Sequence, residues 1–219
     1  MMDPQDDVEG FTAKWRERWP EWTVAGVFVP APWRPLVEAW FALLQEFTDA
    51  AWGGDDATPG LAKLAWWSEE LRGWAKGARR HPLGAVLQRQ AVDWTALATA
   101  LRGLQAARGR VPPEAADLAA FAEAVARIEA ILFDGALDGE AGQGAASRVL
   151  ADVLAEHALA HGVAPSAAPR PRRDAGTRPR RIQSALLSAR LARLAAGRPV
   201  GALRPWRSLW LAWGAARAG

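Results

Sequence analysis

Paired carboxylates are the first groups in this sequence that could do chemistry. Glu46 and Asp49 lie three residues apart in an apolar, periodic segment, so a helix there would project both to the same side. Two carboxylates on neighbouring turns can bind Mg²⁺ whose remaining ligands are water and phosphate oxygens. Acids at this spacing are also common on helix faces that bind nothing, and on these residues alone that second interpretation is favoured.

Asp55 and Asp56 have a simpler interpretation. They follow Gly53-Gly54, which favour a helix end, and they precede Thr58-Pro59, a favoured N-cap and first-turn pair. Acids just before a helix start interact favourably with the positive end of its dipole. The stretch therefore predicts a helix stop followed by a new helix start.

Two histidines form a second cluster. His157 and His161 are four residues apart, with Asp152 and Glu156 close by. Histidines one turn apart can bind zinc, but the order is not His-Glu-x-x-His and no third ligand is evident. A polar helix face exposed to solvent is the favoured interpretation.

A basic stretch lies between two predicted helices and contains Lys76, Arg79, Arg80 and His81. Cations at the end of a helix complement its dipole, which explains them without a ligand. If they border a cavity, they could instead bind a diphosphate, because the guanidinium fork matches phosphate oxygens.

The elements that must position these groups are almost all helical. Apolar residues recur at helical spacing, and no strand pair or internal repeat is evident. We expect an all-α fold of about seven or eight helices in one domain, 1–219. The expected helices cover 11–19, 35–52, 58–74, 82–101, 114–133, 145–162, 180–197 and 203–219, with an extended lead-in at 24–33 and a mobile Pro/Arg-rich connection at 163–179.

Composition narrows the class of protein. The chain has no cysteine, which excludes disulfides, thiolate zinc sites and thiol nucleophiles. It shows no Gly-rich phosphate loop, no Rossmann fingerprint and no Ser/His/Asp order. No apolar run approaches a membrane span and no secretory signal is evident, so we expect a cytoplasmic protein.

The net charge of +3 conceals an uneven distribution. Residues 166–219 hold twelve arginines and one acid, Asp174, giving +11 there and −8 before it. Such a split can indicate a contact with nucleic acid or an anionic membrane. Pairing of the two parts within one fold is favoured over both. Nucleic acid is the less favoured partner because stacking aromatics interleave with the arginines only near Trp206.

One segment resembles a known family. "LAKLAWWSEELRGWAKGARRHPLGAVLQ" (61–88) is similar to the squalene/phytoene synthase family, in which "LAWWxEEL" is followed by a basic stretch and "HP". The preceding helix and the closing "RLARLAAGRPVGALRPWRSLWLAWGAAR" also resemble that family. The resemblance implies an isoprenoid-synthase fold with a central apolar cavity, in which Mg²⁺ bound by two aspartate-rich motifs serves to join prenyl diphosphates.

Both aspartate-rich motifs are incomplete here. The first, typically Asp-Asp-x-x-Asp, aligns with 48–52, where only Asp49 is acidic and Thr48 and Trp52 replace its outer members. The nearest counterpart of the second is Asp152 with Glu156, without the usual amide and arginine. Several Mg²⁺ ions need carboxylates from both facing helices. We therefore favour a non-catalytic or altered member of isoprenoid metabolism that binds a prenyl chain or a protein partner.

The alternative is an active Mg²⁺-dependent prenyl transferase. In that case Glu46 and Asp49 would face Asp152 and Glu156 and form a metal site with fewer carboxylates than the family's, and Arg79 and Arg80 would bind the diphosphate. A prenyl diphosphate or another isoprenoid lipid is the expected ligand, and Mg²⁺ the cofactor only of the active form. The Arg-rich C-terminal part is the candidate for a peripheral contact with anionic membrane.

Overall fold

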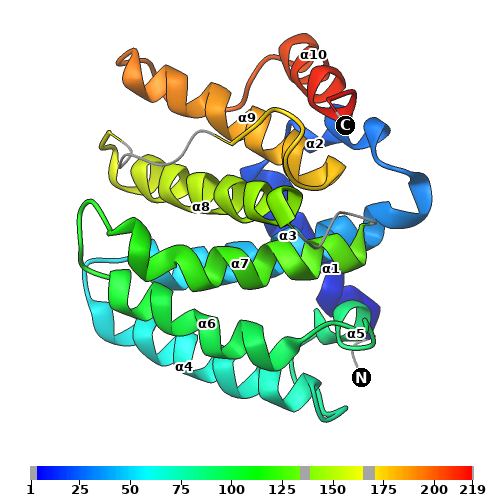
Figure 1. Ribbon diagram of the computed structural model, residues 1–219, viewed down its shortest axis with the longest axis vertical. Helices are drawn as coiled ribbons and strands as arrows, with labels where there is room; N and C mark the ends of the chain where they lie inside the picture. The colour runs from blue at the N-terminus through cyan, green and yellow to red at the C-terminus, as the bar shows by residue number, and fades with distance from the viewer. Residues whose placement is uncertain (1–3, 134–138, 165–170, 219) are drawn as a thin grey trace.

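The computed structural model describes residues 4–133, 139–164 and 171–218, and its regular structure there is entirely helical (Figure 1). This confirms the all-α prediction. The described residues form ten α-helices and two short 3-10 turns: α1 (Pro4–Arg18), α2 (Trp22–Ala25), η1 (Gly26–Phe28), η2 (Ala31–Trp33), α3 (Arg34–Trp52), α4 (Ala57–Trp74), α5 (Gly84–Leu87), α6 (Trp94–Ala107), α7 (Ala115–Leu132), α8 (Gly139–His161), α9 (Arg178–Ala195) and α10 (Pro205–Ala216).

The middle of the bundle is α3. Fourteen of its nineteen residues are buried, because α1, α4, α6 and α8 all pack against it. Its apolar residues recur at helical spacing, and Pro35 in the first turn suits a helix start. Gly53 and Gly54 follow its last residue, as expected. The Arg108 guanidinium then donates to the carbonyls of Ala51, Gly53 and Asp56, fixing this end of the helix.

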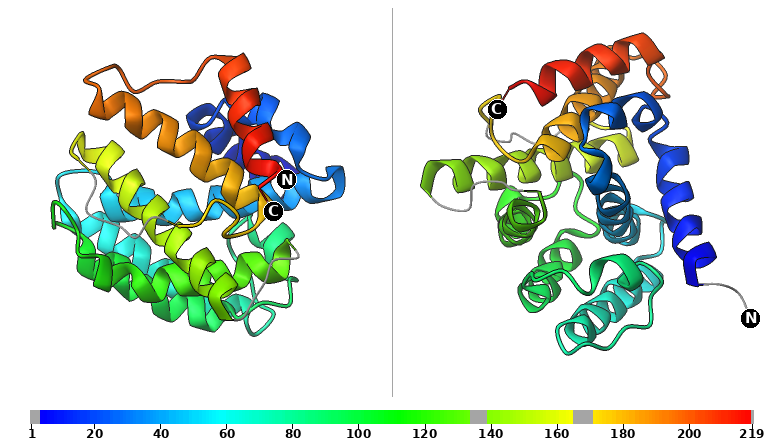
Figure 2. Two further views of the ribbon diagram at one scale, coloured as in Figure 1. Left: turned by 45° about the horizontal axis from the view of Figure 1, so that its top comes forward. Right: turned by 90° about the vertical axis from the view of Figure 1, so that its right-hand side faces the viewer.

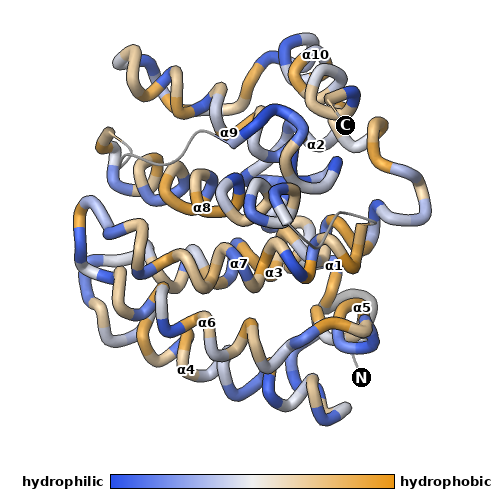
Figure 3. Tube along the Cα trace, viewed as in Figure 1, coloured by the Kyte–Doolittle hydropathy of each residue, from blue (hydrophilic) through white to orange (hydrophobic). Residues whose placement is uncertain are grey.

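The later helices form a stack. From α6 to α10 each helix packs against the next, so the chain proceeds across the molecule from one end to the other (Figures 1 and 2). Apolar residues run along α3, α7 and α8 in the middle (Figure 3), where Trp40 and Phe47 are fully buried. Within the described ranges, no helix combines the length and hydropathy required to cross a bilayer.

Three local predictions are wrong. Residues 24–33 form helical turns rather than an extended lead-in. The single helix expected over 82–101 is divided into α5 and α6, because the Asp93 carboxylate accepts from the Ala96 N–H at 2.8 Å and starts α6 as its N-cap. The N-cap of α4 is Asp56, which accepts from Thr58 N, rather than Thr58 itself. The one-turn helices raise the number above the seven or eight expected.

The connection expected to be mobile, 163–179, lies partly outside the described residues. Its described residues are 163–164 and 171–179, of which the last two already belong to α9, and two arginines hold the turn at 171–177. Arg148 donates to the carbonyl of Ala175 at 2.6 Å, and Arg181 donates to that of Gly176 at 2.6 Å. The backbone carbonyls of this turn are therefore tied to α8 and α9.

Candidate functional site

One pocket of about 430 Å³ brings together the helices that carry the predicted acids. It lies between α1, α3, α8 and α9, and we call it the α3–α8 pocket. Its apolar wall consists mainly of aromatic and leucine side chains: Trp15, Trp19, Phe41, Leu44, Trp52 and Leu159. Its polar lining is Arg18, Gln45, Thr48, Asp49, Glu156, Arg180, Gln183 and Arg190. Three larger hollows, of about 550, 700 and 670 Å³, contain none of the predicted site residues.

Cations from outside α3 neutralise Glu46 and Asp49, its two predicted metal ligands. Glu46 accepts from Lys14 Nζ at 2.9 Å and lies 2.7 Å from Lys63 Nζ. Asp49 lies 3.1 Å from the same Lys14 nitrogen and 2.6 Å from Arg18. Two carboxylates therefore share three cations, which come from α1 and α4.

This arrangement keeps Glu46 ionised. Burial alone would raise the pKa of Glu46, but the hydrogen bonds and charges of Lys63 and Lys14 outweigh it and hold that pKa below its ordinary value. The pKa of Lys14 is correspondingly raised: burial opposes its charge, and the two carboxylates overcome that effect.

The acids of α8 have the opposite surroundings. Asp152 is buried and accepts from Arg180 at 3.2 Å and from the Ser184 hydroxyl at 2.6 Å. Glu156 lines the α3–α8 pocket. Burial and the nearby Asp152 charge raise the pKa of Glu156 to about 7, against the opposing effects of Arg180, Arg18 and the Thr48 hydroxyl. Glu156 is thus divided between its neutral and ionised forms at neutral pH.

Arg180 explains why neutralisation is incomplete on this side. Its guanidinium pairs with Glu129 through several N–H groups, and Glu129 also accepts from Trp40 Nε1 at 2.8 Å. The Arg180 pKa is raised, because the charges of Glu129, Asp152 and Glu156 together overcome its burial. Arg180 thus interacts with three carboxylates. Burial raises the pKa of Asp152 despite its contact with Arg180.

The predicted acids are only partly brought together. Asp49 and Glu156 line the same pocket. Asp152 and Glu46 do not: Asp152 pairs with Arg180, and Glu46 pairs with Lys63 of α4. Among the described residues, no three His, Asp or Glu side chains are placed to hold a metal ion.

The predicted diphosphate ligands lie elsewhere. Arg79 and Arg80 are exposed and do not line the α3–α8 pocket. Arg80 Nε donates to Glu70 at 2.9 Å, and its guanidinium lies 5.5 Å from the centre of the Trp66 ring. Glu70, fully buried, also accepts from Trp74 Nε1 and from the backbone N–H groups of Arg80 and His81.

The segment that resembles the synthase family therefore has a structural role. Glu70 fixes the turn that leads to His81-Pro82, and His81 packs 4.4 Å from the Trp67 ring. Burial lowers the pKa of His81 to about 4, against the charges of Glu46 and Glu70. Trp67 is fully buried, whereas Trp66 is partly exposed.

The two histidines of α8 are not a solvent-facing pair. His157 is buried, and its ring packs edge-on against Trp52 at 4.9 Å and stacks on His161 at 4.2 Å. The expectation of a solvent-exposed face is wrong for His157, because α8 turns this side toward the end of α3.

Two unpaired polar atoms of pocket-lining residues were not singled out from the sequence. Gln45 Oε1 and Trp52 Nε1 are buried and have no hydrogen-bond partner among the described residues, and both side chains belong to the pocket lining. Leaving such atoms unpaired is costly, so a ligand atom or water that reached either one would satisfy it. The sequence held no signal for them, because tertiary packing alone creates their isolation.

Comparison of the chain with protein-family models, with curated proteins and with solved structures finds no match. The resemblance to squalene/phytoene synthases therefore stays a prediction from the sequence.

Proposed function

We propose that this chain is a non-catalytic squalene/phytoene synthase-like protein that binds an uncharged prenyl chain, or a similar amphipathic isoprenoid, in the α3–α8 pocket. The observation that carries the proposal is the pairing of the predicted metal ligands with cations of the chain itself. Glu46 and Asp49 contact Lys14, Arg18 and Lys63, and Asp152 contacts Arg180.

This pairing does not fit a magnesium cluster. A divalent ion at Asp49 would have to displace Lys14 and Arg18 or lie beside them, where like charges repel. Glu156 contributes a carboxylate that is half protonated near pH 7, which further weakens any Mg²⁺ site. Mg²⁺-dependent ionisation of a diphosphate is therefore not the chemistry that these side chains favour.

The same pairing argues against a diphosphate head group. The three pocket arginines are each matched to an acid: Arg18 to Asp49, Arg180 to Glu129 and Arg190 to Glu21. A diphosphate would enter a pocket whose cations are already neutralised. An uncharged head group avoids this cost, and a hydroxyl would supply the donor that Gln45 Oε1 lacks or the acceptor that Trp52 Nε1 lacks once either side chain turns toward the ligand.

The wall and the volume suit the remainder of such a ligand. Four tryptophan and phenylalanine rings and two leucines present apolar surface, and about 430 Å³ lies within the usual ~300–1,000 Å³ of small-molecule pockets. An isoprenoid alcohol supplies an apolar chain and one hydroxyl, which match these two parts of the lining.

Thermal unfolding with farnesol as the probe tests this proposal. We expect farnesol to raise Tm equally with and without Mg²⁺, and farnesyl diphosphate to raise it less. Trp52→Phe keeps the ring and removes the N–H, so it should weaken farnesol binding about tenfold. Trp94→Phe is the matched control, because Trp94 Nε1 is also buried without a partner but lies outside the pocket.

The active prenyl transferase is the second candidate, supported by the presence of Asp49 and Glu156 in one pocket. It predicts a Tm rise that requires both Mg²⁺ and farnesyl diphosphate and is lost in Asp49→Asn and Glu156→Gln. That result, or formation of a head-to-head prenyl product, would overturn the proposal of a non-catalytic binder.

A further inference from the structure

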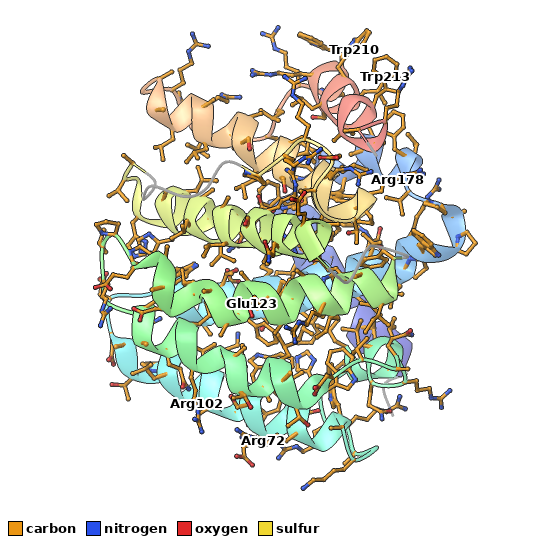
Figure 4. All side chains as sticks on the ribbon, in the orientation of Figure 1. Arg72, Arg102, Glu123, Arg178, Trp210 and Trp213 are labelled. Carbon is orange, nitrogen blue, oxygen red and sulfur yellow. The ribbon has the colours of Figure 1, made fainter. Side chains whose placement is uncertain are left out.

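The last helix, α10, buries small residues and exposes large apolar ones, which is the reverse of an ordinary surface helix. Its fully buried residues are small, Ser208 and Ala212, whereas its large apolar residues are exposed. Trp206 and Trp210 are each 61% exposed and Trp213 is 40% exposed. Figure 4 shows Trp210 and Trp213 at the outer end of the molecule, directed away from the bundle.

These residues form one continuous face. Trp206, Leu209, Trp210 and Trp213 are spaced by three and four residues, so they lie along one side of the helix. Trp210 and Trp213 contact each other edge-on, with ring centres 5.2 Å apart. We call these four residues the tryptophan face. Contiguous exposed apolar surface of this kind marks an interaction site rather than ordinary scatter.

The tryptophan face is surrounded by positive charge. Arg198, Arg204, Arg207 and Arg217 are exposed on α10 and the segment before it, and Arg217 lies 4.8 Å over the Trp213 ring. The sequence contains no acid after Asp174. Any occupant must therefore offer apolar surface and negative charge together.

An anionic lipid bilayer has this combination. Tryptophan is enriched at membrane–water interfaces, where its ring lies at headgroup level, and arginine side chains bind lipid phosphates. With twelve residues, α10 is about 18 Å long, which suits a helix lying in the interface rather than one crossing it. A second copy of the chain fits less well, because two-fold pairing of this face would bring its arginines together.

We propose that α10 is a membrane-docking helix, which places the tryptophan face in the interface of an anionic lipid bilayer and its arginines on lipid phosphates. This surface is separate from the α3–α8 pocket, so the proposal holds or fails independently of the ligand there.

Vesicle co-sedimentation of the full chain tests this proposal. We expect binding to vesicles of phosphatidylcholine with phosphatidylglycerol, and binding at least about tenfold weaker to phosphatidylcholine alone. Arg204→Gln/Arg207→Gln/Arg217→Gln should weaken binding on the order of a hundredfold, since each interfacial cation contributes about fivefold. Salt of about 1 M should abolish the preference for anionic lipid, because the Debye length falls to about 3 Å.

The apolar contribution is tested separately by Trp206→Ser/Trp210→Ser/Trp213→Ser, which should lose at least tenfold in vesicle binding. Matched controls change three exposed residues elsewhere: Leu61→Ser/Val111→Ser/Ile131→Ser for the apolar set and Arg89→Gln/Arg102→Gln/Arg127→Gln for the charges. Arg102 lies at the opposite end of the molecule (Figure 4). Both controls should bind as the wild type does.

Three results would overturn the proposal. The first is no binding to either vesicle at low ionic strength. The second is wild-type binding by the tryptophan variant with unchanged circular dichroism. The third is a concentration-dependent dimer, seen by light scattering, that the tryptophan variant abolishes while vesicles bind nothing; this would assign the face to a second copy of the chain.

Discussion

Each of the helices α3 and α8 carries one Asp and one Glu about one turn apart, Glu46 with Asp49 and Asp152 with Glu156, yet their surroundings shift the pKa values in opposite directions. Glu46 and Asp49 share three cations, and the pKa of Glu46 is lowered. Asp152 and Glu156 share one arginine with Glu129, and the pKa values of both are raised. Burial raises the pKa values of Asp152 and Glu156, whereas for Glu46 the nearby lysines outweigh burial, so the number of cations around each buried acid sets the direction of its shift.

The comparison also distinguishes binding from metal catalysis. A magnesium site between facing helices needs ionised acids on both sides that no protein cation has already neutralised. Glu46 and Asp49 are already paired with protein cations, and Glu156, with a pKa of about 7, is partly protonated at neutral pH. Neither side meets both conditions, which is the physical content of the proposal that this chain binds without ionising a diphosphate.

Removal of Arg180 should have the largest effect. Arg180→Met leaves Glu129 and Asp152 buried without their cation, which should lower the free energy of unfolding by about 3–5 kcal/mol at pH 7. The loss should shrink at acid pH as these carboxylates protonate. Urea unfolding measures both effects. Arg102→Met, on the surface, should change stability by no more than about 0.5 kcal/mol, and a comparably small loss in Arg180→Met would contradict this account.

Glu156 should give the protein a measurable pH dependence at neutral pH. Its pKa is about 7 in the folded chain against an ordinary 4.5, so the folded state binds this proton more tightly than the unfolded state does. Its contribution to stability is complete below pH 4.5 and is lost as the pH rises through 7. Glu156→Gln stays neutral throughout, so its stability relative to wild type should rise by about 1–3 kcal/mol between pH 5 and pH 8.

Unfolding curves of both proteins across that pH range make the measurement. Glu123→Gln is the control, because Glu123 is exposed on α7 and should leave the pH profile unchanged (Figure 4). A wild-type profile parallel to that of Glu156→Gln would refute the raised pKa.

The sequence predicted the long helices well because their stripes are set by local spacing. The helices expected at 35–52 and 180–197 correspond to α3 and α9 within about two residues. Asp93 could also have been recognised as an N-cap, since an Asp before Trp94 and Thr95 is a standard start signal. The one-turn helices near Gly26 could not, because four residues are too few to show a period.

The site was less predictable for a different reason. The sequence identified Asp49 and Glu156, which share a pocket, but it gave no sign that Lys14, Lys63 or Arg180 would neutralise the neighbouring acids. Such pairs join different helices and depend on how those helices pack. The tryptophan spacing in α10 was evident too, whereas its outward direction follows from the small residues, Ser208 and Ala212, that face the bundle.

The two lysines that neutralise Glu46 should matter least to stability, which completes the comparison. Lys14→Met/Lys63→Met should cost about 1–2 kcal/mol at pH 7, because both lysines are partly exposed although Glu46 is buried. The lowered pKa of Glu46 contributes stability that is present above its ordinary 4.5 and lost as the pH falls through the folded value. The double variant should therefore lose less stability than wild type between pH 5 and pH 3.

Lys76→Met is the matched control, since Lys76 is exposed and is the third lysine of the chain. Urea unfolding at the two pH values compares all three proteins, and an acid loss equal in wild type and double variant would show that Lys14 and Lys63 do not set the ionisation of Glu46.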